Sequence, residues 1–269
     1  MIRRKALNVE GHRGAITNAH ENSMEAFLEA ERLEIDGIEF DLWLTSDHVP
    51  VISHAKTKGG LEVLLSTITN KLDYVFLPLI SSENLKNYVY PNTHTKIPTF
   101  QEMLLALKDS KLYLNVELKE SRPELAEAVI KIIQKVKPSA KIIFSSFYFS
   151  LRPIIDDLCH KNGLPRYPFG YLVGPENDFP PLDELASTIM PREDSINIDV
   201  QFVLLKSEQV RQYIEKAIAI GLVIKCYNLI VLSEFEDHDL FDTLVEFGVE
   251  TFICNRVEKL LHYNKSKSL

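Results

Sequence analysis

Histidine and arginine side chains stand at the ends of two apolar segments in the first half of the chain. EGHRG, at 10–14, places His12 and Arg13 at the end of one predicted strand, and PVISH, at 50–54, ends on His54. A histidine at a strand end is more often a structural hydrogen-bonding residue than a catalyst. Two of them beside an arginine favour a reactive site, where they could accept and donate protons near neutral pH.

Alternation along two further predicted strands places carboxylates on the face opposite the apolar residues. In GIEFDLWL these are Glu39 and Asp41, and in LYLNVELK they are Glu117 with Lys119. Three inward carboxylates exceed the positive charge of Arg13 and Lys119, so either a bound cation or a wider ion-pair network could neutralise them. Both explanations stay open from the pattern alone. Ligands that are all oxygen suit Mg2+ or Ca2+ rather than zinc.

Strand-like segments alternate with amphipathic helices from end to end, which predicts an α/β protein. The predicted strands are 6–11, 36–44, 111–118, 141–146, 167–173, 195–200, 221–228 and 250–255. Eight such units indicate a (β/α)8 TIM barrel, a fold of typically ~250 residues, as a single domain over 1–262. A doubly wound open sheet is the alternative, but no glycine-rich fingerprint follows the first strand. In a barrel, the carboxyl ends of the strands would bring the reactive residues to one mouth.

Helix signals support this reading. Amphipathic patterns predict helices at 23–34, 122–136, 149–161, 207–219 and 234–247. Capping boxes are predicted at Thr99 with Glu102 and at Ser233 with Glu236. Glu21 and Asn22 precede the first helix, and we interpret them as capping and loop-bracing residues.

Residues 55–97 interrupt the alternation and form an elaborated connection after the second strand. Long connections are usually functional or mobile, and we expect this one to lie over the barrel mouth and influence the choice of substrate. Its aromatic side chains either contact an apolar or cationic group of a substrate or simply pack the segment onto the barrel. They are Tyr74, Phe76, Tyr88 and Tyr90.

Composition limits the partners and the compartment. The net charge of -8 argues against nucleic acid, although a few local cations would still suit a small phosphorylated substrate. Three scattered cysteines predict no disulfide framework, which favours the cytoplasm, and no window approaches the ~18 apolar residues of an integral membrane segment. Residues 263–269 are predicted to be a disordered tail. The oligomeric state is not predicted.

Several segments, in a fixed order, resemble the glycerophosphodiester phosphodiesterase family of metal-dependent (β/α)8 barrels. The matching segments are GHRG at 11–14, ENSMEAF at 21–27, DGIEFDLWLTSDHVPVISH at 36–54, KIPTFQEML at 96–104 and LNVELK at 114–119. Each motif alone is weak, whereas the ordered set is specific. The second half of the chain resembles the family only by its strand rhythm and by Asn228.

The resemblance implies hydrolysis of a glycerophosphodiester to glycerol 3-phosphate and an alcohol. It implies that Glu39, Asp41 and Glu117 hold one divalent cation, Mg2+ or Ca2+, that His12 and His54 act as base and acid, and that Arg13 and Lys119 bind the substrate phosphate. A catalytically silent barrel that binds a phosphorylated ligand or a partner protein is the alternative.

Three positions depart from the family pattern. Ala55 replaces the Asp that usually follows the second histidine, Lys225 replaces an aromatic residue, and CNRV at 254–257 replaces Thr-Asp-x-Pro. Lys225 and Glu10 both fall on inward-facing positions, where an unpaired buried charge would cost several kcal/mol. We therefore predict that these two residues pair, or that Lys225 turns to the substrate phosphate.

Overall fold

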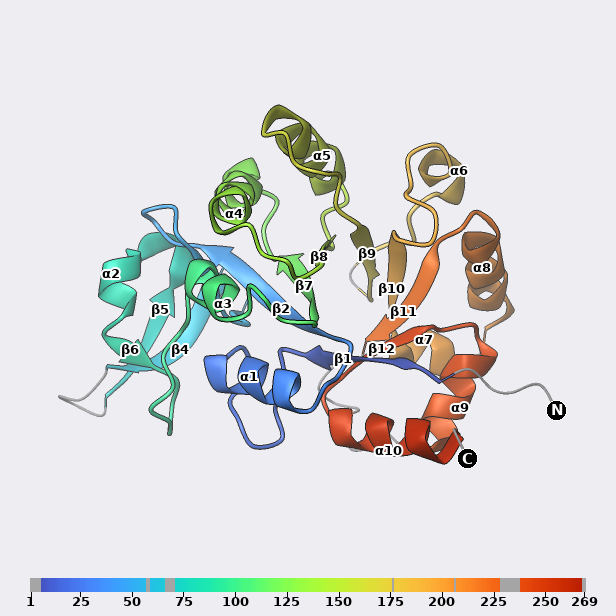
Figure 1. Ribbon diagram of the computed structural model, residues 1–269, viewed down its shortest axis with the longest axis horizontal. Helices are drawn as coiled ribbons and strands as arrows, with labels where there is room; N and C mark the ends of the chain where they lie inside the picture. Colours follow the sequence, from blue (N-terminus) through green and yellow to red (C-terminus); the bar gives the residue numbers. More distant parts are fainter. Residues whose placement is uncertain are drawn as a thin grey trace.

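A computed structural model describes residues 6–56, 59–65, 71–175, 177–205, 207–227 and 238–267 (Figure 1). Within these residues, eight parallel strands close into a barrel, in the order β1-β12-β11-β10-β9-β8-β7-β2 with β2 pairing back to β1. The strands are β1 (Asn8–His12), β2 (Gly37–Leu44), β7 (Tyr113–Leu118), β8 (Ile142–Ser146), β9 (Phe169–Val173), β10 (Ser195–Asp199), β11 (Val223–Tyr227) and β12 (Thr251–Cys254). The predicted (β/α)8 TIM barrel is confirmed.

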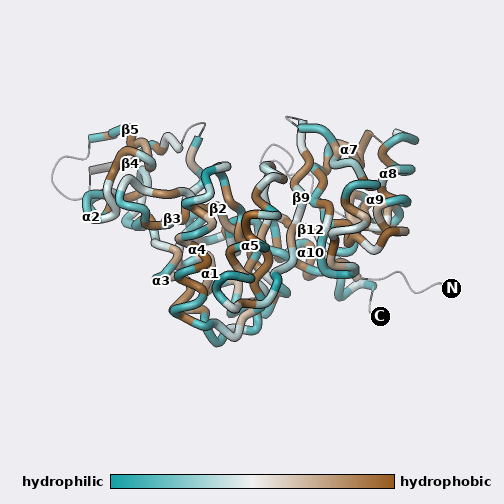
Figure 2. The backbone as a smooth tube through the Cα atoms, turned by 90° about the horizontal axis from the view of Figure 1, so that it is seen from above, coloured by the Kyte–Doolittle hydropathy of each residue, from teal (hydrophilic) through white to brown (hydrophobic). Residues whose placement is uncertain are grey.

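Helices surround the barrel (Figure 1). They are α1 (Met24–Arg32), α3 (Phe100–Ala106), α4 (Pro123–Val136), α5 (Leu151–Lys161), α6 (Leu182–Leu185), α7 (Val200–Leu204), α8 (Glu208–Ala219), α9 (His238–Glu246) and α10 (Val257–Lys267). The main core lies between strands and helices, where Phe40, Phe144 and Phe252 are fully buried. Figure 2 shows the apolar residues concentrated on the strands and on parts of the helices. The alternation therefore sends one face of each strand to this core and frees the other face for the barrel interior.

Helix ends agree with the sequence signals in part. The capping box of Thr99 and Glu102 is present at the start of α3. The box predicted at Ser233 and Glu236 lies outside the described residues. The predicted disordered tail is wrong for 263–267, which continue α10, because Tyr263 is fully buried and donates a hydrogen bond to Asp242.

Residues 50–97, between β2 and α3, form a short strand and a small separate sheet. Strand β3 (Pro50–Ile52) pairs antiparallel with β2, and β4 (Gly60–Leu65), β5 (Leu72–Phe76) and β6 (Tyr88–Val89) form a sheet in the order β5-β4-β6. The 3-10 helix η2 (Leu77–Leu79) and α2 (Ser82–Leu85) follow β5. A second core under this sheet contains Trp43, Val63 and Val75. Figures 1 and 2 place it at one end of the molecule, beyond the carboxyl end of β2.

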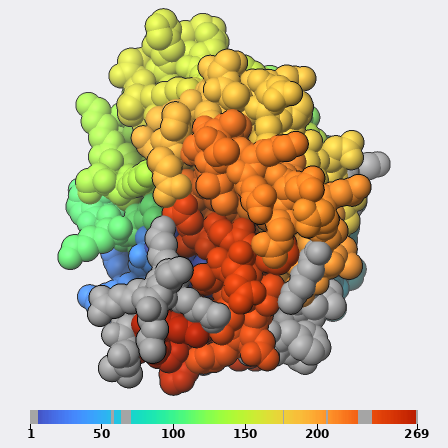
Figure 3. Space-filling view, turned by 90° about the vertical axis from the view of Figure 1, so that its right-hand side faces the viewer, coloured from blue at the N-terminus to red at the C-terminus, as the bar shows by residue number. Residues whose placement is uncertain are grey.

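The opposite side of the barrel is built from the second half of the chain. Figure 3 shows this side, whose surface is formed mainly by residues from about 170 onward. Across the part of the chain that the structure describes, no helix combines the length and apolar composition needed to cross a membrane. Cys159, Cys226 and Cys254 are buried thiols.

Candidate active site

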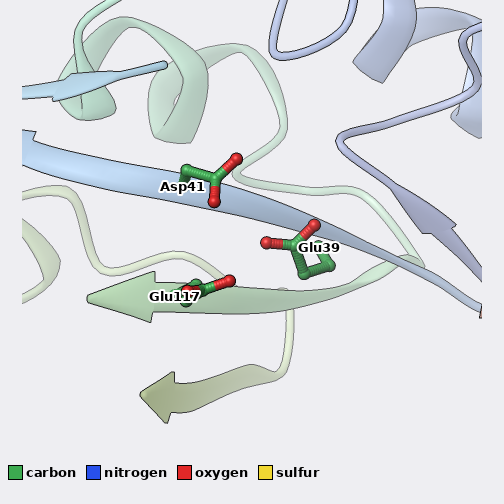
Figure 4. Close-up of side chains that lie close together, drawn as sticks. All are labelled: Glu39, Asp41 and Glu117. Atoms are coloured by element: carbon green, nitrogen blue, oxygen red, sulfur yellow. The ribbon is translucent and has the colours of Figure 1, made fainter. Parts of the chain in front are cut away.

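Strand register brings the three predicted metal ligands together. Asp41 on β2 lies opposite Glu117 on β7, and Glu39 on β2 lies opposite His12 on β1. Each of the three acids offers one carboxylate oxygen, and these oxygens lie within 4.8 Å of one another, all buried. Figure 4 shows the three carboxyl groups meeting between β2 and β7. Because the positions are set by paired strands rather than by loops, the relative placement of the three carboxylates is precise.

Positive charge around this cluster is distributed unevenly. Asp41 lies 3.3 Å from Arg13 Nε and 3.3 Å from Lys119 Nζ, and Lys119 Nζ lies 2.7 Å from Glu117. Glu39 Oε2 accepts the backbone N–H of Arg13 at 3.1 Å. Its Oε1 is buried and has no hydrogen-bond partner among the described residues. Within the same described residues, no Lys or Arg side chain lies within ion-pair distance of the Glu39 carboxylate. The protein thus leaves one carboxylate short of positive charge.

The pKa values of the acids follow this imbalance. Burial, together with the charges of Asp41 and Glu117, raises the pKa of Glu39 well above its usual value. Burial also raises the pKa of Glu117, against the attraction of Lys119. For Asp41, burial opposes ionisation, but Lys119 and Arg13 outweigh it and keep its pKa low. An unpartnered oxygen within an all-oxygen set fits a hard divalent cation, which would supply the missing charge.

His12 is held in one orientation from the far end of the chain. Its Nδ1 lies 2.7 Å from the amide oxygen of Asn255, which follows β12. Since that oxygen only accepts hydrogen bonds, Nδ1 carries the proton and Nε2 keeps a lone pair, 3.9 Å from Glu39 Oε2. Burial and the neighbouring Arg13 lower the pKa of His12 to about 3. The ring is therefore a neutral proton acceptor.

The loop after β1 is braced by Glu21 and Asn22. Arg13 Nη1 donates to Glu21 at 2.7 Å, and Asn22 Nδ2 donates to Asp41 at 2.7 Å. Both Arg13 and Asn22 adopt the left-handed backbone conformation, at φ of 59° and 55°, which such side chains tolerate where surrounding contacts hold them. Loop bracing is thus confirmed, whereas the cap of α1 is Ser23.

His54 approaches the same site from the end of β3. It is half-buried, and the residue before it donates its backbone N–H to the carbonyl of Asp41 at 3.0 Å. Burial lowers the pKa of His54, with Asp41 acting in the opposite direction. Ala55, where the family usually has Asp, packs in the core of the small sheet.

A small pocket of about 70 Å³ unites these groups. Its polar wall contains six of the seven predicted site residues: His12, Arg13, Glu39, His54, Glu117 and Lys119. Its other wall is apolar and consists of Phe147, Leu172, Tyr227 and Ile253. Asp41, the seventh residue, does not line the pocket but forms ion pairs with Arg13 and Lys119, which do. A larger cavity of about 640 Å³ beside α3 and α4 contains none of the seven.

Two further observations concern residues outside the predicted set. Lys225 Nζ lies 2.7 Å from Glu10 Oε2, so the predicted pairing is confirmed and the alternative, Lys225 turned to the substrate, is wrong. Asn255 was missed as a partner of His12. Its position directly after the last barrel strand was the available signal, because that position opens onto the same mouth.

Comparison with known proteins identifies the family. Residues 12–259 match the glycerophosphoryl diester phosphodiesterase family. The chain belongs to this family. A glycerophosphodiester phosphodiesterase from Caldanaerobacter subterraneus subsp. tengcongensis is 30% identical over 159 residues, which are 54% of this chain and 60% of that relative. The match thus spans well under the relative's full length.

Solved structures share the fold over nearly the whole chain. A glycerophosphodiester phosphodiesterase from Thermotoga maritima has a TM-score of 0.68 at 25% identity, covering 95% of this chain and 97% of that one. An Oleispira antarctica phosphodiesterase, solved in complex with the product sn-glycerol-3-phosphate, has a TM-score of 0.71 at 19% identity, covering 97% of each chain. At 19% identity the second likeness concerns the fold alone.

Proposed function

We propose that this protein hydrolyses a glycerophosphodiester to glycerol 3-phosphate and an alcohol, with one divalent cation, Mg2+ or Ca2+. The observation that carries this proposal is the convergence of Glu39, Asp41 and Glu117 beside two histidines in one pocket. Membership of the family supports it, as does a structural neighbour that holds sn-glycerol-3-phosphate. Bound at these carboxylates, the cation would offset negative charge on the phosphate oxygens.

Arg13 and Lys119 are assigned to the phosphate. Although burial opposes their charge, neighbouring carboxylates raise the pKa of both, so both stay cationic. Both line the pocket and would attract the non-bridging oxygens of a diester. The apolar wall opposite excludes water from this side, which strengthens the attraction.

His12 and His54 are assigned to proton transfer. His12 Nε2, with its free lone pair, would accept a proton from the attacking hydroxyl, supplied by water or by the glycerol of the substrate. His54 must first take up a proton against its lowered pKa, and the resulting imidazolium would donate that proton to the departing alcohol oxygen as the P–O bond breaks. Each transfer typically contributes ~10²–10⁴-fold to the rate.

The segment 55–97 is assigned a role in head-group choice. Tyr74 and Phe76 are exposed on β5 and contact each other edge to face, and Tyr88 is half-buried. Shortening the connection between β4 and β5 and replacing Tyr74 with alanine should change the ranking of activities among diesters. An unchanged ranking would remove the segment from substrate choice. The buried thiols favour a cytoplasmic location, which stays a prediction.

The direct test is product release. The purified protein, freed of metal, is incubated with glycerophosphocholine and a panel of related diesters with Mg2+, Ca2+ or EDTA, and glycerol 3-phosphate is measured. We expect release only with a divalent cation, and a ~10²–10⁴-fold loss in His12→Gln and His54→Gln. His160→Gln, an exposed histidine on α5, serves as the control and should be unaffected.

Ala55 is the observation that favours the alternative function. It leaves the position after His54 without a carboxylate, and the silent barrel would bind a phosphorylated ligand without cleaving it. Absence of release from every diester under every metal, with retained binding of glycerol 3-phosphate, would establish that alternative.

A further inference from the structure

Tyr90 brings the end of the 50–97 segment back to the barrel. It directly follows β6 and is only 4% exposed. Its ring stacks on the imidazole of His20, with ring centroids 3.8 Å apart and 15° between the planes. Its hydroxyl lies 3.5 Å from the carbonyl oxygen of Ile52. One side chain therefore contacts both the loop after β1 and strand β3.

On one side, the stack leads to the arginine of the site. His20 Nδ1 lies 2.7 Å from the carbonyl oxygen of Glu21, so Nδ1 carries the hydrogen and donates it. The carboxylate of Glu21 in turn accepts a hydrogen bond from Arg13 Nη1 at 2.7 Å. The imidazole of His20 thus holds the backbone of Glu21, whose carboxylate binds Arg13.

On the other side, the stack leads to His54. Ile52 donates its backbone N–H to Pro98 at 2.8 Å, and Ser53 donates to the carbonyl of Asp41 at 3.0 Å. His54 is the next residue. A shift of β3 would therefore displace His54 relative to the carboxylates.

We propose that Tyr90 and His20 are positioning residues, whose stack fixes the separation between the loop that carries Arg13 and the segment directly after β3 that carries His54. The inference rests on the proposed function, since it concerns the residues that bind phosphate and transfer protons. Because Tyr90 is buried against His20, its ring is not available to contact a head group. The same contact gives His20 a role that its sequence context did not suggest.

The size of the effect follows from the strength of aromatic stacking. If the stabilisation from such an aromatic pair holds Arg13 and His54 in place, loss of the pair lowers kcat/KM by about 2- to 10-fold. Displacement of His54 lowers kcat, and displacement of Arg13 raises KM. A stack that served only packing would instead lower the melting temperature and leave both constants unchanged well below it.

The test compares Tyr90→Leu, His20→Ala, the double variant and His20→Phe in the full chain. We expect each of the first two variants to lower kcat/KM by about 2- to 10-fold. The double variant should be no less active than the less active of the two single variants, because both substitutions remove the same contact. His20→Phe keeps an aromatic partner for Tyr90 and should restore most of the activity. His160→Ala is the matched control for His20→Ala, because His160 is exposed on α5, and it should leave kcat and KM unchanged.

Hydrogen exchange separates this inference from the proposed function, because it needs no substrate. Backbone amides of residues 15–22 should exchange faster in Tyr90→Leu and His20→Ala than in the wild type or His160→Ala. If the wild type cleaves no diester, the proposed function fails, and faster exchange still supports the stack as the anchor of this loop. Unchanged exchange overturns the inference, as does unchanged kcat/KM in an active background.

Discussion

The barrel interior holds two clusters of buried polar side chains, which differ in how their carboxylates are neutralised. In the interior cluster (Glu10, Tyr113, Asn115, Lys225), Glu10 lies 2.7 Å from Lys225 Nζ and accepts hydrogen bonds from Tyr113 at 2.8 Å and Asn115 at 2.6 Å. In the mouth cluster (Glu39, Asp41, Glu117), three carboxylates share two basic side chains.

The difference separates a structural charge network from a binding site. The interior cluster balances one negative charge with one positive charge and gives both oxygens of Glu10 hydrogen-bond donors, so its charge requires no ion. Its one buried atom without a partner among the described residues is the amide oxygen of Asn115, which is neutral. The mouth cluster keeps a buried oxygen of Glu39 without a partner among the described residues and raises the pKa of that acid. A protein tolerates such an imbalance where a ligand removes it.

The largest effect is expected when the mouth cluster loses Glu39. Glu39→Gln should lower metal-dependent hydrolysis at least about 1,000-fold, since a catalytic cation stabilises the transition state by several kcal/mol. The fold should persist, and the metal-free variant should melt no lower than the wild type, because one of three mutually repelling carboxylates is gone. Kinetics with Mg2+ and a thermal melt in EDTA check both parts. A variant that keeps full metal-dependent activity contradicts the difference between the clusters.

The interior cluster should respond in stability rather than in metal binding. Lys225→Met leaves Glu10 as a buried charge without its cation and should lower the free energy of unfolding by about 3–5 kcal/mol. The double variant Glu10→Gln/Lys225→Met should recover most of that loss. Urea denaturation measures it, and a loss below about 1 kcal/mol in the single variant would show that the pair is dispensable.

Removal of one hydrogen bond from the interior cluster should cost less stability than removal of its cation. Tyr113→Phe deletes the hydroxyl that donates to Glu10 and should cost about 1.5–3 kcal/mol, as is typical of hydrogen bonds to charged groups. The dependence of activity on metal concentration should not change. If the dependence of activity on metal concentration shifts, the two clusters are coupled and do not act independently.

Lowering the pH should affect the stability of the mouth cluster through protonation of Glu39. Because its pKa is raised in the folded protein, the folded state without metal binds this proton more readily than the unfolded state, and this contribution to stability grows as the pH falls. The melting temperature of the metal-free wild type, measured against Glu39→Gln, should therefore rise from pH 8 toward pH 5. Saturating Mg2+ should abolish or reverse the trend, and a trend of the opposite sign in EDTA would contradict the raised pKa.

The sequence predicted the mouth cluster because side-chain direction along a strand is a local property. Glu39 and Asp41 are two residues apart, so they share a face in any strand, and parallel pairing in a barrel leaves few registers for Glu117. The same reasoning placed Glu10 and Lys225 inside the barrel, where the cost of an unpaired charge selected their pairing.

Contacts between distant segments could not be predicted in this way. His12 and Asn255 are 243 residues apart, and no periodicity indicates which amide meets which imidazole. The end of α10 was mistaken for a tail because NKSKSL is polar, whereas the packing of Tyr263 against the barrel extends the helix to Lys267. Tertiary contacts decided both cases.

Calorimetric titration of the metal-free protein with Mg2+ and with Ca2+ tests the central claim most directly. The account predicts one binding site per chain in the wild type, loss of that site in Glu39→Gln and Glu117→Gln, and an unchanged site in Glu10→Gln/Lys225→Met. Absence of binding of either ion to the wild type, or equal affinity in Glu39→Gln, would contradict a metal centre at the mouth of the barrel.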